Sequence, residues 1–244
     1  MRRAAFHDGG HEFDDRAAYP RIKMAMIPHG REVTAAFLKN REEVLATYGK
    51  HLWPDESSTE QRRRMKATTN AFDMDASPNI WAKRFGNPAG RTLVGVKKTL
   101  SDGSKFSMEE YQSAQEGGTD WLWDNAGTGL KSFLKRSYPK ADERKRRLRW
   151  KSYVLQEAEA VAREAKLAWC ARHGVRVMSL QHDGIVTGKL GEGWDEESAA
   201  HAMQEEATKA CGLEVQVKGD TCWCDAAEDW GGWGVFQQGG FVVD

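Results

Sequence analysis

Apolar and polar positions in the last third of the chain follow first a helical and then a strand period. Between residues 152 and 172 apolar side chains recur every three or four positions, which predicts an amphipathic helix ended by Gly174: Leu155, Ala158, Ala162, Ala165 and Trp169. VRVMSL (175–180) and IVTG (185–188) are typical of two strands, and HDG between them is typical of a tight turn. The pattern predicts a helix followed by a hairpin.

A second helix and a further strand follow this hairpin. Asp195 can cap a helix that has Glu196 and Glu197 in its first turn, runs to about Cys211 and stops at Gly212. LEVQV (213–217) alternates as a strand does. Helix, hairpin, helix and strand together predict an α+β fold in which helices cover one face of an antiparallel sheet.

Earlier in the chain the recognisable signals are a helix cap and two turn sequences. Ser57 and Glu60 form a capping box, and the helix that it begins contains no Pro or Gly before Pro78. For residues 86–130, rich in Gly and Trp, the pattern predicts no definite element; SDGS (101–104) and EGGTD (116–120) are turn signals.

Composition excludes several classes of protein. The 244 residues contain 36 Lys and Arg against 36 Asp and Glu, so only local clusters such as 141–151 and 61–66 could attract a nucleic acid, and either run could also be a solvated helix face. The four cysteines lack zinc-site spacing, which favours reduced thiols and an intracellular protein. No run of 18 apolar residues and no signal peptide is found, so neither a membrane protein nor a secreted one is expected.

Two acidic segments are candidates for chemistry. His182 and Asp183 lie at the predicted hairpin, where an Asp-Gly pair also has the simple explanation of a turn. In EFDDRAAYPRIKMAMI (12–27) Asp14 is followed by apolar residues that alternate as a strand does, and a turn is again the simpler interpretation. Mg²⁺ prefers carboxylate oxygens together with substrate phosphates, so two acids at strand ends would suit it.

The helix between the two acids carries matching cations. Arg62 and Lys66 are four residues apart and therefore lie on one helix face. Two acids for metal ions and two cations for phosphates form a set suited to a nucleoside triphosphate.

With these residues the chain resembles the palm and fingers of DNA polymerases, most closely family A. Asp14 is similar to motif A, Arg62-x3-Lys66 to motif B, and His182-Asp183 to motif C. The separations of 52 and 117 residues have the short-then-long order of family A. Gln156 resembles the glutamine of the helix that precedes motif C, and residues 213–226 resemble the closing palm strand. The resemblance covers residues 12–80 and 150–230.

Other positions depart from family A. Gly184 stands where the family has Glu, and Asn70 and Met74 stand where its fingers helix has an aromatic residue and a Tyr. Tyr19, five residues after Asp14, and Asn70, four after Lys66, instead resemble the DxxSLYP and KxxxN motifs of family B.

The resemblance implies a discontinuous palm with an inserted fingers region: 1–30 with motif A, 31–150 helical with motif B, and 151–244 with the motif C hairpin and closing strand. It implies DNA synthesis from dNTPs on a primer-template, with two Mg²⁺ ions, or Mn²⁺, held by Asp14 and Asp183. Further polymerase domains or subunits are implied as partners.

The resemblance also implies a role for each remaining candidate. Lys66 and Arg62 would bind phosphates, Tyr19 would exclude a ribose 2′-OH, and Asn70 would lie at the nucleotide. Contact with primer or template is implied for four residues: His182, Gln156, Arg144 and Arg147.

Three alternatives stay open from the residues alone. The first is an inactive palm that binds nucleic acid or a partner, which Gly184 and Asn70 favour. The second is a metal-dependent phosphohydrolase, although such enzymes commonly use several His ligands. The third is a structural α+β domain in which Asp183 only makes a turn. The polymerase interpretation predicts that Asp14 and Asp183 approach within metal-bridging distance and that Lys66 faces the same cleft, and primer extension would distinguish an active enzyme from an inactive palm.

Overall fold

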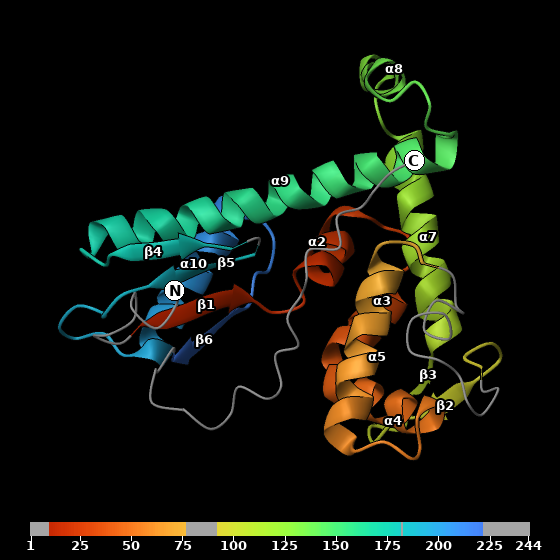
Figure 1. The fold of residues 1–244 in the computed structure, drawn as a ribbon, viewed down its shortest axis with the longest axis horizontal. Helices are drawn as coiled ribbons and strands as arrows, with labels where there is room; N and C mark the ends of the chain where they lie inside the picture. The colour runs from red at the N-terminus through yellow and green to blue at the C-terminus, as the bar shows by residue number, and fades with distance from the viewer. Residues whose placement is uncertain (1–9, 77–91, 182, 222–244) are drawn as a thin grey trace.

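The computed structural model describes residues 10–76, 92–181 and 183–221. Its sheet contains β1 (His11–Asp15), β4 (Val177–Leu180), β5 (Gly184–Thr187) and β6 (Val217–Thr221), in the order β4-β5-β1-β6 with every neighbouring pair antiparallel (Figure 1). Because β1 lies in the middle, its last residues are flanked by strands from the far end of the sequence.

Two helices cover one face of this sheet. They are α9 (Glu143–Arg172) and α10 (Glu196–Cys211). Phe13 and Ile185, paired across β1 and β5, pack against Trp169 of α9 and Met203 of α10, and all four side chains are buried. The predicted α+β class, an antiparallel sheet with helices on one face and a separate helical part, is therefore confirmed.

The local signals for the last helices are confirmed in the structure. The Asp195 side chain accepts a hydrogen bond from the Ser198 N–H at 2.7 Å, and Gly212 ends α10 with φ of 66°. Helix α9 begins earlier than the pattern predicts, because Asp142 caps it by accepting from the Lys145 N–H at 2.7 Å. The boundary expected at residue 150 thus falls inside one helix, and the division into palm and fingers stays a prediction.

Two strand predictions are wrong. The last strand is Val217–Thr221 rather than 213–217, because the Val215 and Val217 N–H groups bond to Thr208 and Gln204 of α10 before the chain reaches β1. The residues after Asp15 form helix α2 (Ala18–Met26) instead of an alternating strand. Pro20 lies in its first turn, where a proline is tolerated.

The rest of the described chain forms a helical part with a core of its own. It contains α3 (Arg31–Lys39), α4 (Arg41–Leu52), α5 (Ser58–Asp73), α7 (Met108–Asp124), α8 (Thr128–Ser137) and the hairpin β2 (Lys97–Thr99) with β3 (Lys105–Ser107). Its buried aromatic centre comprises Phe37, Tyr48, Phe106 and Tyr111. Ser57 caps α5 as predicted, but the helix ends at Asp73, before Pro78, which lies outside the described residues.

One of the two turn signals is confirmed and the other is wrong. SDGS forms the turn between β2 and β3, with Gly103 at φ of 78°. EGGTD instead lies inside α7. A Cβ atom on Gly117 would be 2.2 Å from His29 Nε2, so this glycine permits close packing of α7 on the 27–30 segment rather than a turn.

Buried ion pairs join the helical part to α9. Lys23 of α2 donates to the Asp73 carbonyl at 2.6 Å and to Gln115 Oε1 at 2.7 Å, and Tyr111 donates to Asp73 Oδ1 at 2.9 Å. Lys151 of α9, fully buried, pairs with Asp75. These contacts fix α2, α5, α7 and α9 relative to one another.

None of the described helices combines the length and the apolar character that a membrane span requires.

Candidate active site

Asp14 lies in β1, and Asp183 lies directly before the neighbouring strand β5. Asp14 is opposite Gly184 in the β1–β5 register, and Asp183 directly precedes Gly184. The Asp15 N–H donates to the Asp183 carbonyl at 3.2 Å, which ties the end of β1 to the hairpin. Segments 169 residues apart in sequence therefore meet at one end of the sheet.

Gly184 makes room for the Asp14 carboxylate. A Cβ atom on residue 184 would lie 2.0 Å from Asp14 Oδ1, so any side chain there would displace the carboxylate. The Glu that the resemblance expects at this position is thus incompatible with this placement of Asp14. The glycine that breaks the family pattern is the residue that lets Asp14 lie across β5.

Asp14 is partly buried and is surrounded by other acidic residues. Burial, then the charges of Glu12, Asp183 and Asp15, raise its pKa from 3.8 to about 6, while Lys166 acts in the opposite direction. Its Oδ1 is buried and has no hydrogen-bond partner within the described part of the chain. An unpaired carboxylate oxygen among other acids is a position where a bound cation would relieve electrostatic repulsion.

This raised pKa predicts how stability depends on pH. The folded state holds the Asp14 proton more tightly than the unfolded chain does, so the resulting stability is present below about pH 4 and is lost as pH rises through about 6. Asp14→Asn should therefore be more stable than the unmodified protein at pH 7 by on the order of 1 kcal/mol, discounted because the group is half exposed, and equally stable near pH 4. Thermal unfolding from pH 4 to 7 in a chelator measures this difference.

A control variant should show the opposite trend. Arg63 and Arg64 lower the pKa of Glu60 to about 2, so Glu60→Gln should lose stability at pH 7 and approach the unmodified protein in acid. Asp14→Asn less stable than the unmodified protein at pH 7 would contradict the proposed repulsion.

Lys166 holds the two acidic segments together. Its ammonium, fully buried in α9, donates to Asp15 Oδ1 at 2.6 Å and to the Asp183 carbonyl at 2.8 Å. Burial raises the pKa of Asp15 and the Lys166 charge opposes that shift. One cation thus bridges β1 and the hairpin from the helix side of the sheet.

Tyr19 and Glu159 lie near the same acids. Tyr19 of α2 and Glu159 of α9 lie close enough for each to shift the pKa of the other, and the Glu159 residue is only 4% exposed. Burial, followed by the charges of Asp183 and Asp15, raises the pKa of Glu159 to about 7. Burial and the neighbouring acids raise the pKa of Tyr19 to about 12. Tyr19 therefore lies among the same group of acids as Asp183.

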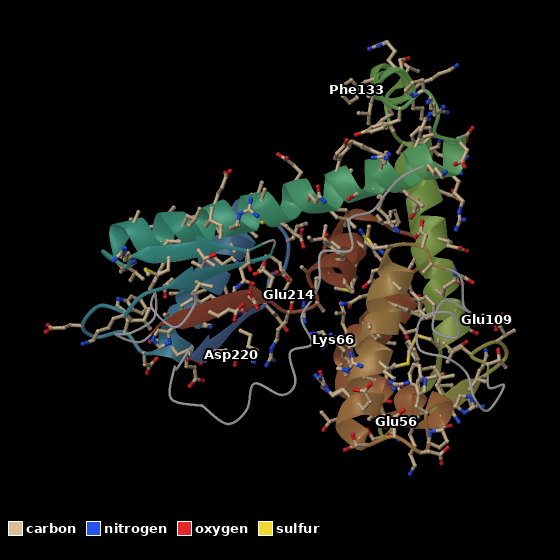
Figure 2. The ribbon with its side chains drawn as sticks, viewed as in Figure 1. Glu56, Lys66, Glu109, Phe133, Glu214 and Asp220 are labelled. Carbon is tan, nitrogen blue, oxygen red and sulfur yellow. The ribbon has the colours of Figure 1, made fainter. Side chains whose placement is uncertain are left out.

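The three residues predicted on the fingers helix are exposed on α5. Arg62, Lys66 and Asn70 follow one another at four-residue spacing, which places them along one side of the helix. Figure 2 shows Lys66 on the side of α5 nearest the four-stranded sheet. Arg62 is engaged by Glu42 of α4 through two hydrogen bonds, of 2.6 and 3.0 Å. The sequence alone gives no signal for this pairing, because α4 and α5 come into contact only in the fold.

The residues predicted at the DNA all lie on α9, except His182, which lies outside the described residues. Gln156 is exposed and donates to Ser152 Oγ at 3.2 Å. Arg144 donates to the Asp75 carbonyl at 3.3 Å. Arg147 forms ion pairs with Glu143 and Asp120, both at 2.5 Å. The arginines therefore already have protein partners: Arg147 has Asp120 of α7 and Glu143 of α9, and Arg144 has the Asp75 carbonyl just after α5.

The carboxylates of Asp14 and Asp183 suit a hard divalent cation that takes its remaining ligands from substrate and water. Within the described residues no group of three His, Cys, Asp or Glu side chains forms a metal site. Mg²⁺ is commonly held by one or two carboxylates, and substrate phosphates and water complete its shell. Asp14, with its unpaired oxygen, and Asp183, whose charge Asp14 senses, fit that pattern.

Two charged residues of α9 were missed from the sequence. Leu155, Ala162 and Trp169 form its buried face, and Glu159 and Lys166 lie on that same face at helical spacing. A charged side chain on the apolar face of a helix needs a buried partner. The presence of Glu159 and Lys166 on that face was therefore the sequence signal that could have identified them.

Comparison with known proteins shows the fold. No protein-family model matches the chain, and no curated protein matches it in sequence. Among solved structures, the POL domain of Pol1 from M. smegmatis, in complex with DNA primer-template and dNTP, is similar with a TM-score of 0.50 and 15% identity. The similarity covers 87% of this chain and 39% of that one. The chain has the fold of part of a DNA polymerase domain and spans well under half of that neighbour's length.

Proposed function

We propose that this chain is the palm and fingers part of a DNA polymerase and transfers nucleotides from dNTPs to a primer 3′-OH. The observation that carries the proposal is that Asp14, near the end of β1, lies beside Asp183 of the hairpin in a fold similar to a polymerase domain. The raised pKa of Asp14 supports it, because perturbed carboxylates gather at functional sites.

Asp14 and Asp183 are the residues that would hold Mg²⁺, or Mn²⁺ in its place. When bound, such ions activate a hydroxyl nucleophile and neutralise charge on a triphosphate. Lys166 keeps the two acidic segments in register, and Gly184 leaves the Asp14 carboxylate its position over β5.

The helix α5 supplies the cations of the proposed nucleotide site. Lys66 makes no ion pair within the described part of the chain and would bind the triphosphate as a point charge. Arg62 would bind it through its planar fork after leaving Glu42. Asn70 and Tyr19 would lie at the base and the sugar, and the Tyr19 ring would occupy the space of a ribose 2′-OH.

The proposed DNA surface runs along α9 and α8. Between residues 128 and 150 there are nine Lys and Arg against two acidic residues, although the chain as a whole is neutral. Figure 1 shows α8 projecting beyond the junction of α7 and α9. Phosphate contacts supply most sequence-independent DNA affinity, so Arg144, Arg147 and Gln156 are assigned to the primer-template, together with His182.

Primer extension tests the proposal. Purified protein is incubated with a labelled primer-template, dNTPs and Mg²⁺, and nucleotide hydrolysis is followed in parallel without primer. Template-directed extension supports synthesis, and hydrolysis without primer supports a phosphohydrolase instead. DNA binding with neither reaction identifies an inactive palm, or a palm that needs the further domains or subunits which the polymerase proposal includes.

Glu42 is expected to weaken nucleotide binding by competing for Arg62. Glu42→Gln should tighten dNTP binding about two- to threefold, since exposed ion pairs of this kind contribute roughly 0.2–1 kcal/mol. Arg62→Gln should weaken it. The dissociation constant is measured with a dideoxy-terminated primer, so that no reaction follows.

Glu60→Gln is the matched control for this prediction, because Glu60 pairs with Arg63 and Arg64 rather than Arg62. It should leave the dNTP dissociation constant unchanged. Equal effects of Glu42→Gln and Glu60→Gln would indicate a general change in surface charge instead of release of Arg62.

A further inference from the structure

Asp75 closes the C-terminal end of α5 at a position where glycine is the usual residue. The Asp75 N–H donates to the Phe72 carbonyl at 2.9 Å. The Ala76 N–H donates to the Ala71 carbonyl at 3.0 Å, and these two bonds together are a common way for an α-helix to end. Asp75 has φ of 58°, in the left-handed region that glycine adopts most easily. The helix end alone would favour glycine, so the presence of Asp75 points to a role for its carboxylate.

That carboxylate is held inside the protein by α9. Lys151 pairs with Asp75 Oδ1, and the two side chains are only 0% and 5% exposed. Arg144, two helical turns before Lys151, donates to the Asp75 carbonyl at 3.3 Å. Helix α9 therefore binds both the side chain and the backbone of the residue that ends α5.

A second buried ion pair holds the same end of α5 from two other helices. Lys23 of α2 lies 3.6 Å from Asp73 Oδ1 and donates to the Asp73 carbonyl at 2.6 Å. Tyr111 of α7 donates to the same carboxylate at 2.9 Å. Removing one partner of a buried pair leaves a charge that the interior does not tolerate, so these contacts strongly favour one placement of α5.

The helix that holds Asp75 also holds the acidic site. Lys166, like Lys151, is fully buried in α9, and it donates to Asp15 and to the Asp183 carbonyl. The two lysines are 15 residues apart on one continuous helix, which corresponds to about 22 Å. Figure 1 shows this helix extending from the four-stranded sheet to α7. A single helix thus determines how far α5 lies from the acids.

We infer that Lys151 is a positioning residue, which through Asp75 fixes α5 at the distance from the acidic site that a bound nucleoside triphosphate requires. Lys66 on α5 then reaches the phosphates of a nucleotide whose metal ion is held by Asp14 and Asp183. The ligand in this inference rests on the proposed function, whereas the position of α5 can be measured without any ligand. Because Lys151 is fully buried, it acts only through its partner.

Three variants separate position from stability: Lys151→Met, Asp75→Asn and the double variant. Each single variant leaves one buried charge without its partner and should unfold at a lower denaturant concentration. The double variant removes both charges and should regain most of the stability, but it lacks the ion pair. Lys209→Met, the same substitution at an exposed position of α10, is the control.

The first measurement is the distance between α5 and α10. Spin labels are attached to unnatural amino acids at Arg63 and Glu205, whose side chains are 60% and 70% exposed, so that the native cysteines stay unlabelled. The unmodified protein and Lys209→Met should give one narrow distance distribution. The folded double variant should give a shifted or broader one, and an unchanged distribution would overturn the inference.

The second measurement is nucleotide binding and incorporation. The dNTP dissociation constant is determined on a dideoxy-terminated primer-template, and single-turnover incorporation is followed on an extendable primer. The double variant should incorporate nucleotides about 10²-fold more slowly, the effect that a misplacement of about 1 Å can produce, although its stability is regained. Lys209→Met should match the unmodified protein. Incorporation that recovers together with stability in the double variant would show that the pair is merely structural and would overturn the inference.

Failure of this inference and failure of the proposed function give different results. Normal incorporation by both the unmodified protein and the double variant rejects the role of Lys151 and leaves the polymerase proposal standing. Absence of dNTP binding by the unmodified protein overturns the proposed function and the ligand named here. The distance measurement then still decides whether Lys151 positions α5.

Discussion

Asp183→Asn is expected to reduce Mg²⁺-dependent primer extension by roughly 10³-fold or more, the effect of removing a preorganised charge that acts in the transition state. The carboxamide nearly matches the carboxylate in shape but lacks the negative charge that a hard cation requires. Both sheet contacts of Asp183, from the Asp15 N–H and from Lys166, use its backbone carbonyl, so the substitution leaves them in place. Extension kinetics, with thermal unfolding as a check on folding, measure the effect.

Asp220→Asn is the matched control. Asp220 lies in β6 of the same sheet, and its side chain is 60% exposed (Figure 2). Its replacement should leave extension near the level of the unmodified protein. Full activity of Asp183→Asn would refute the assignment of Asp183 and, with it, the proposed mechanism.

Lys166→Met is expected to lower the free energy of unfolding by about 3–5 kcal/mol, since it leaves the buried charge of Asp15 without its partner. Met matches the lysine in length, so lost packing contributes little. Adding Asp15→Asn should restore much of the stability, because the uncompensated charge is removed as well. Chemical denaturation of both single variants and the double variant separates these contributions.

Lys209→Met serves as the control for this prediction. Lys209 is exposed in the last turn of α10, and surface substitutions of this kind change stability by about 0.5 kcal/mol or less. A loss below 1 kcal/mol in Lys166→Met would show that the bridge between β1 and the hairpin is not needed for the fold. It would also remove Lys166 from the account of how Asp14 and Asp183 are held.

The sequence predicted correctly those elements whose signals are local. Asp195 and Gly212 mark the two ends of α10, Ser57 marks the start of α5, and the hairpin that brings Asp183 beside β1 follows from two short apolar runs around a turn. Caps, turns and periodicity act over a few residues, so they can be recognised without the fold.

Other predictions failed where a distant segment decided the outcome. EGGTD reads as a turn but continues α7, because His29 packs directly against Gly117. The alternation after Asp15 suggested a strand, yet these residues form α2, and Lys23 in that helix is buried against Asp73 and Gln115. In both cases the partner lies far away in the sequence.

The sequence by itself determined the α+β class, the capped helices and the pair of acids at positions 14 and 183. Only the tertiary structure decided what surrounds those acids: Lys166 between Asp15 and the hairpin, Glu42 on Arg62, and Gly184 beneath Asp14. The physical reason is that a buried charge is stable only when an oppositely charged or hydrogen-bonding partner is present. Each of these partners comes from another element of the fold.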